Sequence, residues 1–413
     1  MITEIITIGD ELITGHTVDT NAALIARHLT DIGFSVKYRT SIGDSLDSME
    51  EAFRLALNRA RLVITTGGLG PTQDDITRKA IVRLFKRNLI FHQEILDDIR
   101  ARFARRGLEM PAINQNQALL PQGASLFANK YGSAVGICIA EEGRIFIALP
   151  GVPSEAEQIL IDEVVPYLKG LQVNRATKTI KLRTTGIFES KLAERIGHDL
   201  KLDSGVRLAY LPSFGGVDLR VLAASDDRQD ATDKAHRLVR HLEESCGRYI
   251  YGRDDDTLEG VIGQLLIDND KTLSVAESCT GGQLGQLITS VSGSSGYFLG
   301  GVIAYANQVK QEQLGVDEDI LEKHGAVSEP CAVAMAVGCR KLLGSDYALS
   351  VTGVSGPAGG SEEKPVGTTF IGLASAHTSF ARKFNFGTKR DTGRSRATYA
   401  ALELLRREIL DIK

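Results

Sequence analysis

Short apolar runs alternate with helix-like spacings of apolar residues along the first part of the chain. Strands are predicted over residues 5–8, 35–40 and 62–65, and helices over 21–29 and 49–60. Strand and helix in turn predict right-handed crossovers and a parallel sheet covered by helices on both faces. We therefore expect an α/β domain of three layers over residues 1–168.

The pattern changes in the middle of the chain, where strands over 177–184, 206–211 and 217–223 accompany helices over 189–200 and 230–246. This order of elements predicts a small α+β domain over residues 169–252. The segment 249–256 contains three consecutive aspartates, which favours a linker.

The last part, residues 253–413, returns to alternating helix and strand and predicts a second α/β domain. The fold class we expect is therefore two three-layer α/β domains with largely parallel sheets, joined by a small α+β domain.

In the last domain, a buried strand breaks at Ser278 and passes through Thr280, Gly281 and Gly282 into a helical pattern. A serine at such a turn points outward, beside the backbone N–H groups of the following helix. These are the requirements of a nucleophile with an oxyanion site. The alternative is an ordinary helix start, because Thr280 followed by Gln283 also fits a capping box.

A base for this serine is predicted further along the chain. Tyr305 ends a predicted strand, and Lys310 lies at the third position of the next helix, where the positive helix end should lower the pKa of the lysine. The domain's two histidines lack a glycine-rich context, so a Ser-Lys or Ser-Tyr-Lys arrangement fits better than a Ser-His-Asp triad. We expect Cys279 to be a packing residue.

Two further features of this domain suit an anionic ligand. A glycine-rich loop over residues 353–360 allows close approach of backbone to ligand. Lys389, Arg390 and Arg394 lie near a helix start and could bind an anion, although a solvated helix face explains them equally well.

In the first domain, acidic or glycine residues follow each of the first three strands. Because the carboxyl ends of parallel strands meet at one edge, these side chains should gather there: Asp10, Glu11, Asp44, Asp74 and Asp75. Carboxylates so close together suit Mg²⁺ or Mn²⁺, and the bare amides of Gly67, Gly68 and Gly70 suit phosphate. The alternative is that the aspartates are turn or N-cap residues.

Composition narrows the functional classes. Hydrophobic residues make up 43% of the 413 residues and charged residues 24%, as in a soluble globular protein. The net charge of −4 gives no footprint for nucleic acid or an anionic membrane, so direct nucleic-acid binding is not expected. Five cysteines without a CxxC motif and no apolar run of membrane length favour a cytoplasmic protein.

The motifs of the first domain resemble those of the CinA family (competence/damage-inducible protein A). The resemblance rests on Gly67-Gly-Leu-Gly-Pro-Thr-Gln-Asp-Asp-Ile-Thr77, Gly9-Asp10-Glu11, Asp44 and Leu149-Pro-Gly-Val-Pro-Ser-Glu155. It implies a molybdopterin-binding-like fold and a divalent-metal-dependent (Mg, Mn or Co) ADP-ribose pyrophosphatase. Substrate would lie on Gly67, Gly68, Thr72 and Asp75, with Asp10 beside it, and metal on Asp44, Asp74 or Asp75. This chain has Asn116 where the family often has a lysine.

The last domain resembles the CinA carboxy-terminal domain, a nicotinamide-nucleotide amidase. The matching blocks are Ala276-Glu-Ser-Cys-Thr-Gly-Gly282, Tyr305 with Lys310, Gly353-Val-Ser-Gly-Pro-Ala-Gly-Gly360 and the stretch ending at Arg394. The resemblance implies metal-free hydrolysis of nicotinamide mononucleotide (NMN) to the nicotinate nucleotide and ammonia. Ser278 would be the nucleophile, activated by Tyr305 and Lys310. Thr280 or nearby amides would hold the oxyanion, and Arg390 or Arg394 the phosphate, with Gly281, Gly282, Gly353 and Gly356 against the substrate.

The middle domain resembles the family's KH-like module. Because Gly215-Gly216 lies between strands rather than helices, it offers no GxxG loop for nucleic acid, and a spacer or dimerisation role is expected, with a homodimer as the assembly. Two other functions remain open: a nucleotide- or pterin-binding regulatory or scaffold protein, and a competence-related accessory protein, each with an inactive first site.

Overall fold

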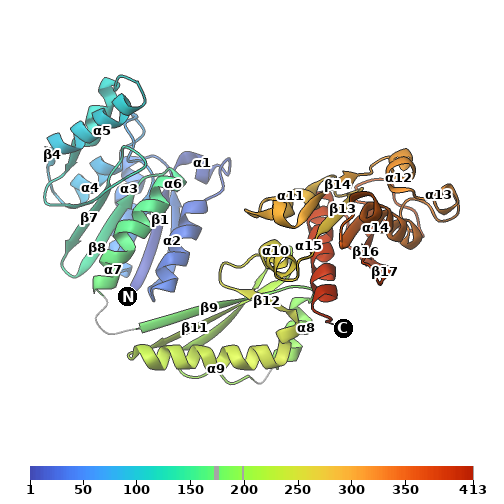
Figure 1. Cartoon of the computed structure of the whole chain (residues 1–413). Coiled ribbons are helices and arrows are strands. Elements are labelled where there is room, and N and C mark those ends of the chain that lie inside the picture. The colour runs from blue at the N-terminus through green and yellow to red at the C-terminus, as the bar shows by residue number, and fades with distance from the viewer. Residues whose placement is uncertain (172–175, 198–199, 413) are drawn as a thin grey trace. The chain divides into compact units, whose positions relative to one another are not determined.

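The computed structural model describes residues 1–171, 176–197 and 200–412. These form two compact units, one of residues 1–178 with 224–231 and one of residues 179–223 with 232–413 (Figure 1). The second unit thus contains most of the middle domain together with the whole of the last one.

The sheet of the first unit has the strand order β2-β1-β3-β8-β7-β6. Its strands are β1 (Ile2–Ile8), β2 (Ser35–Ile42), β3 (Leu62–Thr66), β6 (Ser125–Phe127), β7 (Gly136–Glu141) and β8 (Arg144–Leu149). The first four in the order are mutually parallel, β7 runs antiparallel to β8, and β6 runs antiparallel to β7. The predicted parallel sheet is therefore confirmed and extended by an antiparallel edge.

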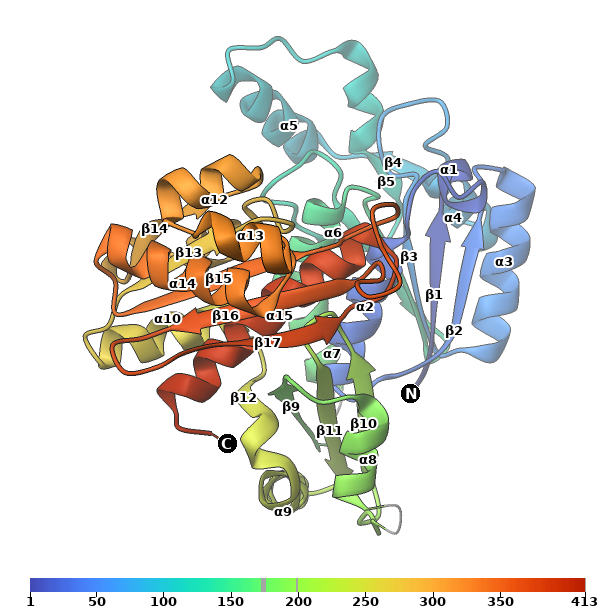
Figure 2. The same cartoon turned by 90° about the vertical axis from the view of Figure 1, so that its right-hand side faces the viewer.

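Helices cover both faces of this sheet. They are α1 (Asp10–Ile13), α2 (Thr20–Asp31), α3 (Leu46–Arg59), α4 (Thr77–Leu84), α5 (Gln93–Arg105), α6 (Pro153–Ile159) and α7 (Val165–Leu171), with a π-helix (Leu160–Val164) between the last two. Ile5 and Ile64 pack against Ile25 of α2, while Ile6 and Phe146 pack against Phe53 of α3. Successive strand residues thus feed opposite cores, as pleating requires, and Figure 2 shows α2 and α3 on opposite sides of β1 and β2.

A small satellite of the first unit pairs β4 (Leu89–Phe91) with β5 (Leu119–Pro121) in antiparallel fashion. A 3₁₀ helix (Ala112–Ala118) precedes β5 and carries Asn116, which is exposed.

The middle domain is a four-stranded sheet in the order β10-β11-β9-β12, with helices on one face. Its elements are β9 (Ala176–Thr184), α8 (Glu189–Ile196), β10 (Val206–Pro212), β11 (Val217–Ser225), α9 (Arg228–Cys246) and β12 (Ile250–Arg253). Figure 1 shows α9 running along the sheet. The helix predicted over 189–200 ends at Ile196, and residues 198 and 199 lie outside the described part of the chain.

The linker predicted over residues 249–256 is wrong at its start. Ile250–Arg253 is the strand β12, which pairs antiparallel with β9. The aspartates that favoured a linker close the turn after it, where the Asp256 carboxylate accepts a hydrogen bond from the Arg253 amide at 2.8 Å. A four-residue strand acquires its structure from its partner, which composition does not reveal.

The last domain has a sheet in the order β14-β13-β15-β16-β17. The strands are β13 (Leu273–Glu277), β14 (Phe298–Ile303), β15 (Tyr347–Gly353), β16 (Thr368–Ala374) and β17 (Ser379–Asn385). The first three in the order are parallel, β16 runs antiparallel to β15, and β17 runs antiparallel to β16.

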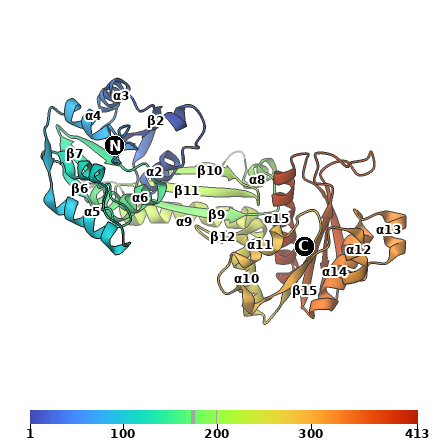
Figure 3. The ribbon, with the colours of Figure 1, turned by 90° about the horizontal axis from the view of Figure 1, so that it is seen from above.

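Its helices form two layers around the sheet. They are α10 (Leu258–Asp268), α11 (Gln283–Thr289), α12 (Asn307–Leu314), α13 (Glu318–His324), α14 (Glu329–Leu343) and α15 (Arg390–Ile409). Residues of α10, α11 and α15 share one core, and those of α12 and α14 share the other. Figure 3 shows α15 and α14 on either side of β15, so the expected three-layer fold is confirmed.

Candidate functional site

The predicted nucleophile lies at the carboxyl end of β13, which is paired on both sides, with β14 and β15. The Ser278 amide donates to the Val351 carbonyl of β15 at 2.9 Å, so sheet pairing continues up to the serine. The chain then turns through Gly281 and Gly282, which have φ angles of +60° and +95°, into α11. Glycine adopts such angles without strain, which explains this pair before the helix. The turn leaves Ser278 only 9% exposed.

Lys310 lies beside this serine. Its Nζ is 3.3 Å from Ser278 Oγ, and it donates to the carbonyls of Ala304 at 2.8 Å and Tyr305 at 3.2 Å. The residue is 1% exposed, and within the described ranges no carboxylate forms an ion pair with it. Burial lowers the pKa of Lys310. The two residues that sequence reasoning paired, 32 positions apart, therefore meet.

The cause of the lowered pKa differs from the prediction. Lys310 is the fourth residue of α12, which begins at Asn307 after an Ala306 N-cap, and its ammonium group reaches back to the carbonyls before the helix. Desolvation, rather than the positive helix end, disfavours the charged amine.

The capping box predicted from Thr280 and Gln283 is absent from the described structure. Gly282 is the N-cap of α11, and no side-chain cap bond is made from it. The buried Glu277 carboxylate instead accepts the amides of Gly282, Leu284 and Gly285 at 3.0, 3.1 and 2.8 Å. The Thr280 hydroxyl is fully buried without a hydrogen-bond partner.

The proposed role of Tyr305 in activating the serine needs correction. Its side chain is 63% exposed, and its hydroxyl lies 3.5 Å from Nη2 of Arg390. Only its backbone carbonyl contacts Lys310. A proton path from Ser278 through the phenol is therefore not supported, and the direct Ser278–Lys310 contact replaces it.

The two arginines proposed for the substrate phosphate differ in surroundings. Arg394 Nη2 donates to the Thr280 carbonyl at 2.6 Å, and its Nε is buried without a partner. Arg390 is exposed and donates to the Gly356 carbonyl at 2.9 Å. Both lie on the first turns of α15. Arg394 thus supports the nucleophile turn, whereas Arg390 can reach solvent and ligand.

The glycine loop after β15 comes close to Arg390. Gly356 has a φ of +72°, and a Cβ there would lie 2.4 Å from Val366. A Cβ on Gly353 would lie 2.8 Å from the Thr368 carbonyl. These glycines are therefore explained by strand packing and turn geometry as well as by ligand approach.

Cys279 is buried, and burial raises the pKa of its thiol, which confirms the packing prediction. His324 and His377 are both exposed, and in the ranges the structure describes neither bonds to Ser278. Among the described residues, the basic side chain beside Ser278 is therefore Lys310 rather than a histidine.

In the first unit, the predicted acidic edge is present. The Asp10 and Asp44 carboxylates accept each other's backbone amides at 3.1 and 3.0 Å. Burial, together with the negative charges of Asp10, Glu11 and Asp74, raises the pKa of Asp44. This edge thus holds negative charge that a cation would stabilise.

Asp75 does not share this role. Its carboxylate accepts the amides of Gly70 and Thr72, each at 2.8 Å, and the Thr72 hydroxyl at 2.5 Å. Asp75 is thus a loop anchor, and Thr72 is held by it. Within the described residues no three acidic, histidine or cysteine side chains form a ready metal cage. Asp44 and Asp74 fit a Mg²⁺-type ion that takes one or two carboxylates and completes its shell with water and substrate phosphate.

The glycine loop after β3 is held tightly. Gly67 and Gly68 have φ angles of +115° and +67°, and a Cβ on Gly67 would lie 2.3 Å from the Ile8 carbonyl. Sequence reasoning missed Arg78, which is buried and donates to the carbonyls of Leu69 and Gly70 at 2.7 and 3.1 Å. An arginine in the first turn of a helix gives no sequence signal for this contact.

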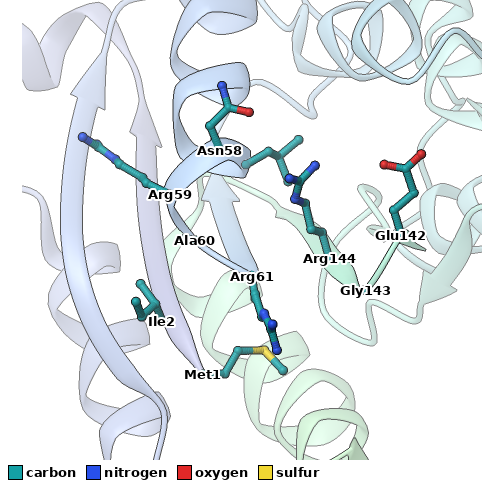
Figure 4. A pocket seen from close by; sticks show the side chains of 10 residues that line it. Met1, Ile2, Asn58, Arg59, Ala60, Arg61, Glu142, Gly143 and Arg144 are labelled. Carbon is teal, nitrogen blue, oxygen red and sulfur yellow. The ribbon is translucent and has the colours of Figure 1, made fainter.

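A cavity of about 760 Å³ is lined by residues of neither candidate site. It is at the amino ends of β1 and β8, where Arg61, Arg144 and Glu142 line it (Figure 4). Ligands of parallel α/β sheets bind at the opposite, carboxyl edge, so the chemistry assigned above does not use this cavity.

Comparison with known proteins follows the same three divisions. The matching family models are described as "Probable molybdopterin binding domain" over residues 4–170, "Damage-inducible protein CinA KH domain" over 179–252 and "CinA C-terminal domain" over 255–409. A CinA-like protein of Gemmatimonas aurantiaca is 43% identical over 409 residues, which cover 98% of this chain and 95% of the relative.

The chain belongs to the CinA family. A CinA-like protein of Microcystis aeruginosa is also similar, at 42% identity over 99% of both chains. Among solved structures, a CinA protein from Thermoplasma acidophilum, titled as of unknown function, is 34% identical and covers 40% of this chain and 97% of its own, with a TM-score of 0.37.

Among the described helices of this CinA-family protein, none has the length and apolar character needed to cross a bilayer.

The Gly215-Gly216 pair lies in the turn between β10 and β11, where Gly215 packs against Tyr399 of α15. The middle domain therefore contacts the helix that also carries Arg390 and Arg394.

Proposed function

We propose that the C-terminal domain hydrolyses the carboxamide of nicotinamide mononucleotide. The observation that carries the proposal is the Ser278–Lys310 pair, with Nζ 3.3 Å from Oγ and the lysine buried without a carboxylate. A neutral amine has two N–H bonds and one lone pair. The carbonyls of Ala304 and Tyr305 take the two N–H bonds, so the lone pair is left for the serine proton.

In the first step, Ser278 Oγ forms a bond to the carboxamide carbon while its proton passes to Lys310. The carbonyl electrons move onto oxygen, where backbone amides bind the anion. The carbon–nitrogen bond then breaks, and Lys310 returns the proton to the leaving nitrogen, which departs as ammonia.

In the second step, water attacks the acyl-serine and gives its proton to Lys310. The bond from carbon to Ser278 Oγ breaks, the serine recovers the proton, and nicotinate mononucleotide leaves. Arg390 is the better candidate for the substrate phosphate, because it is exposed and Arg394 already holds the Thr280 carbonyl.

The test is ammonia release from NMN by the full chain and by Ser278→Ala. The wild type should release ammonia in equal amount to nicotinate mononucleotide, and the variant should release none. Ammonia release at the wild-type rate by Ser278→Ala would show that the nucleophile is wrong. An inactive wild type would leave the domain as a nucleotide-binding module.

For the first unit we propose metal-dependent cleavage of ADP-ribose to AMP and ribose 5-phosphate. Its support is the negative charge gathered at Asp10, Asp44 and Asp74 beside the glycine loop. Asp44 and Asp74 would hold a divalent ion, which would neutralise charge on the diphosphate. Of the loop amides expected to be bare, Gly67 donates to the Leu149 carbonyl at 3.1 Å and Gly70 to Asp75 at 2.8 Å, so the Gly68 amide is the one that would approach the phosphate oxygens.

This proposal is tested by incubating the protein with ADP-ribose and Mg²⁺, Mn²⁺ or Co²⁺ and measuring AMP. Metal-dependent AMP formation supports it. Binding of ADP-ribose without AMP would overturn it in favour of a regulatory or scaffold role for this unit.

A further inference from the structure

Glu277, the residue before the nucleophile, is a buried acid without a cationic partner. It is 2% exposed, and within the described ranges no lysine or arginine pairs with it. A buried carboxylate needs compensation from hydrogen bonds. Three backbone amides supply it: Gly282 and Leu284 donate to one oxygen, and Gly285 donates to the other.

These bonds, together with the direction of the side chain, make Glu277 a poor candidate for the base of the reaction. One of its oxygens already accepts two N–H groups and the other accepts one. Glu277 is the last residue of β13, and sheet pairing continues to Ser278. Because consecutive side chains along a strand point to opposite faces, the Glu277 carboxylate and the Ser278 hydroxyl lie on opposite faces of the sheet. Glu277 instead contributes by fixing the backbone at the start of α11, whose amides it accepts.

The turn has a limited number of amides, and almost all are taken. Ser278 N donates to Val351, Gly281 N to the Ser278 carbonyl, and Gln283 N to the Thr280 carbonyl. Glu277 takes the amides of Gly282, Leu284 and Gly285. In the described backbone, this leaves the amides of Cys279 and Thr280 without an acceptor from another residue.

We propose that Glu277 is a positioning residue that caps α11, fixes the Ser278 turn, and so assigns the oxyanion to the amides of Cys279 and Thr280. The inference rests on the proposed amidase function and deepens it. The inference names the amides of Cys279 and Thr280 as the oxyanion donors, in place of the unspecified N–H groups at the helix start. Arg394 holds the other side of the same turn through the Thr280 carbonyl.

The first experiment compares Glu277→Gln with the wild type in NMN hydrolysis. The glutamine has the same shape, but its amide group turns at least one acceptor into a donor facing an N–H group. We expect kcat to fall about 100-fold, the scale of a misplacement of about 1 Å, while KM and the acid limb of the pH profile stay near wild type. A wild-type kcat in folded Glu277→Gln would overturn the proposal.

The matched control is Asp317→Ala. Asp317 also caps a helix with its carboxylate, accepting the Asp319 amide at 3.0 Å, but it belongs to α13 and has no contact with Ser278 among the described residues. It should lose some stability and keep its kcat. An equal loss of kcat in both variants would show that any weakened helix cap lowers activity, which overturns a specific role for Glu277.

The second experiment needs no variant and so does not depend on folding of Glu277→Gln. A structure of the wild type with pyridine-3-boronic acid should show a bond from boron to Ser278 Oγ, with the serine proton on Lys310. We expect a boronate oxygen about 2.7–3.1 Å from the amides of Cys279 and Thr280. An oxygen on the amides of Leu284 or Gly285, with Glu277 displaced, would overturn the assignment.

These outcomes separate the inference from the proposed function. If Ser278→Ala abolishes ammonia release and Glu277→Gln does not lower it, the positioning role is wrong and the amidase stands. If Ser278→Ala still releases ammonia at the wild-type rate, the amidase mechanism fails first, and the role of Glu277 fails with it.

Discussion

The Nζ of Lys310 lies 3.3 Å from the Oγ of Ser278 at the carboxyl end of β13, with the lysine 1% exposed. Two backbone carbonyls and one hydroxyl surround the amine, and within the described part of the chain no carboxylate balances its charge. An ammonium group could donate to all three oxygens but would be buried without a counter-charge, whereas a neutral amine has no charge to compensate. This arrangement supports the proposed role of Lys310 as the base.

Replacement of Lys310 by methionine removes this base and keeps most of the side-chain volume. General base catalysis contributes about 10²–10⁴-fold in rate, so kcat for NMN should fall by that factor. Lys310→Arg should be equally inactive, because a guanidinium stays protonated. Initial rates of ammonia release measure both. Lys341→Met, an exposed lysine on α14, is the control, and activity in Lys310→Met near that of the control would contradict the assignment.

The lowered pKa of Lys310 sets the sign of the pH dependence. The base must be neutral, so kcat/KM should rise with pH up to the pKa of Lys310, which lies below the ordinary value of 10.5. Burial lowers this pKa, and the nearby thiols of Cys331 and Cys279 oppose the shift. A pH–rate profile between pH 6 and 10 measures the rise in kcat/KM. If the residual activity of Lys310→Met shows the same rise, the titrating group is not Lys310.

The same shift predicts a change in stability. Between the lowered pKa and 10.5 the unfolded chain binds more protons at Lys310 than the folded chain, so the free energy of unfolding rises with pH in that window. Lys310→Met should lack this contribution. Urea unfolding of wild type and Lys310→Met at several pH values measures the difference, and parallel curves for the two proteins would count against the shift.

Some of this site could be predicted from the chain alone. The strand-to-helix turn at Ser278 and a lysine soon after the next strand are local patterns, and parallel neighbours β13 and β14 bring their carboxyl ends together. That topology is what places Lys310 beside Ser278. Likewise, Asp10 and Asp44 follow the adjacent strands β1 and β2, and they exchange backbone hydrogen bonds.

The rest depended on contacts that local patterns do not contain. Glu277 belongs to an apolar strand, and its role as the cap of α11 follows from the path of the turn. Tyr305 is adjacent to the site in sequence, yet its phenol faces Arg390, 85 residues away. Asp75 was predicted to be a metal ligand, but its carboxylate accepts hydrogen bonds from Gly70 and Thr72 of its own loop. Side-chain direction, rather than residue type or spacing, decided each of these cases.

Arg390 and Arg394 should behave differently when replaced by alanine. Arg390→Ala should raise KM for NMN and have less effect on nicotinamide riboside, which lacks the phosphate. Arg394→Ala should lower kcat for both, because the Thr280 carbonyl loses a 2.6 Å hydrogen bond from a buried group. Steady-state kinetics with the two substrates checks this. The assignment of phosphate to Arg390 is wrong if Arg390→Ala raises KM for NMN and for the riboside equally.

Glu403 on α15 joins the middle and last domains through buried charge. It pairs with Arg406 and Arg407, each at 2.7 Å, and Arg406 also donates to the Arg248 carbonyl of the middle domain. Glu403→Gln leaves Arg406 buried without its full counter-charge, which should cost about 3–5 kcal/mol.

Urea unfolding followed by circular dichroism measures that loss. The double variant Glu403→Leu/Arg406→Met should recover much of it, since removing both charges avoids an unpaired one. If Glu403→Gln unfolds at the wild-type midpoint, the pair does not stabilise this part of the chain.

Asp44 and Asp75 should separate metal binding from loop structure in the first unit. Asp44→Asn removes charge from the acidic edge and should abolish metal-dependent AMP formation from ADP-ribose while leaving ammonia release from NMN unchanged. Asp75→Asn keeps the metal edge but weakens three hydrogen bonds that shape the glycine loop. It should therefore raise KM for ADP-ribose more than it raises the metal concentration required. Titrations of metal and of ADP-ribose on each variant measure the two effects. If both variants need the same higher metal concentration, Asp75 is a metal ligand rather than a loop anchor.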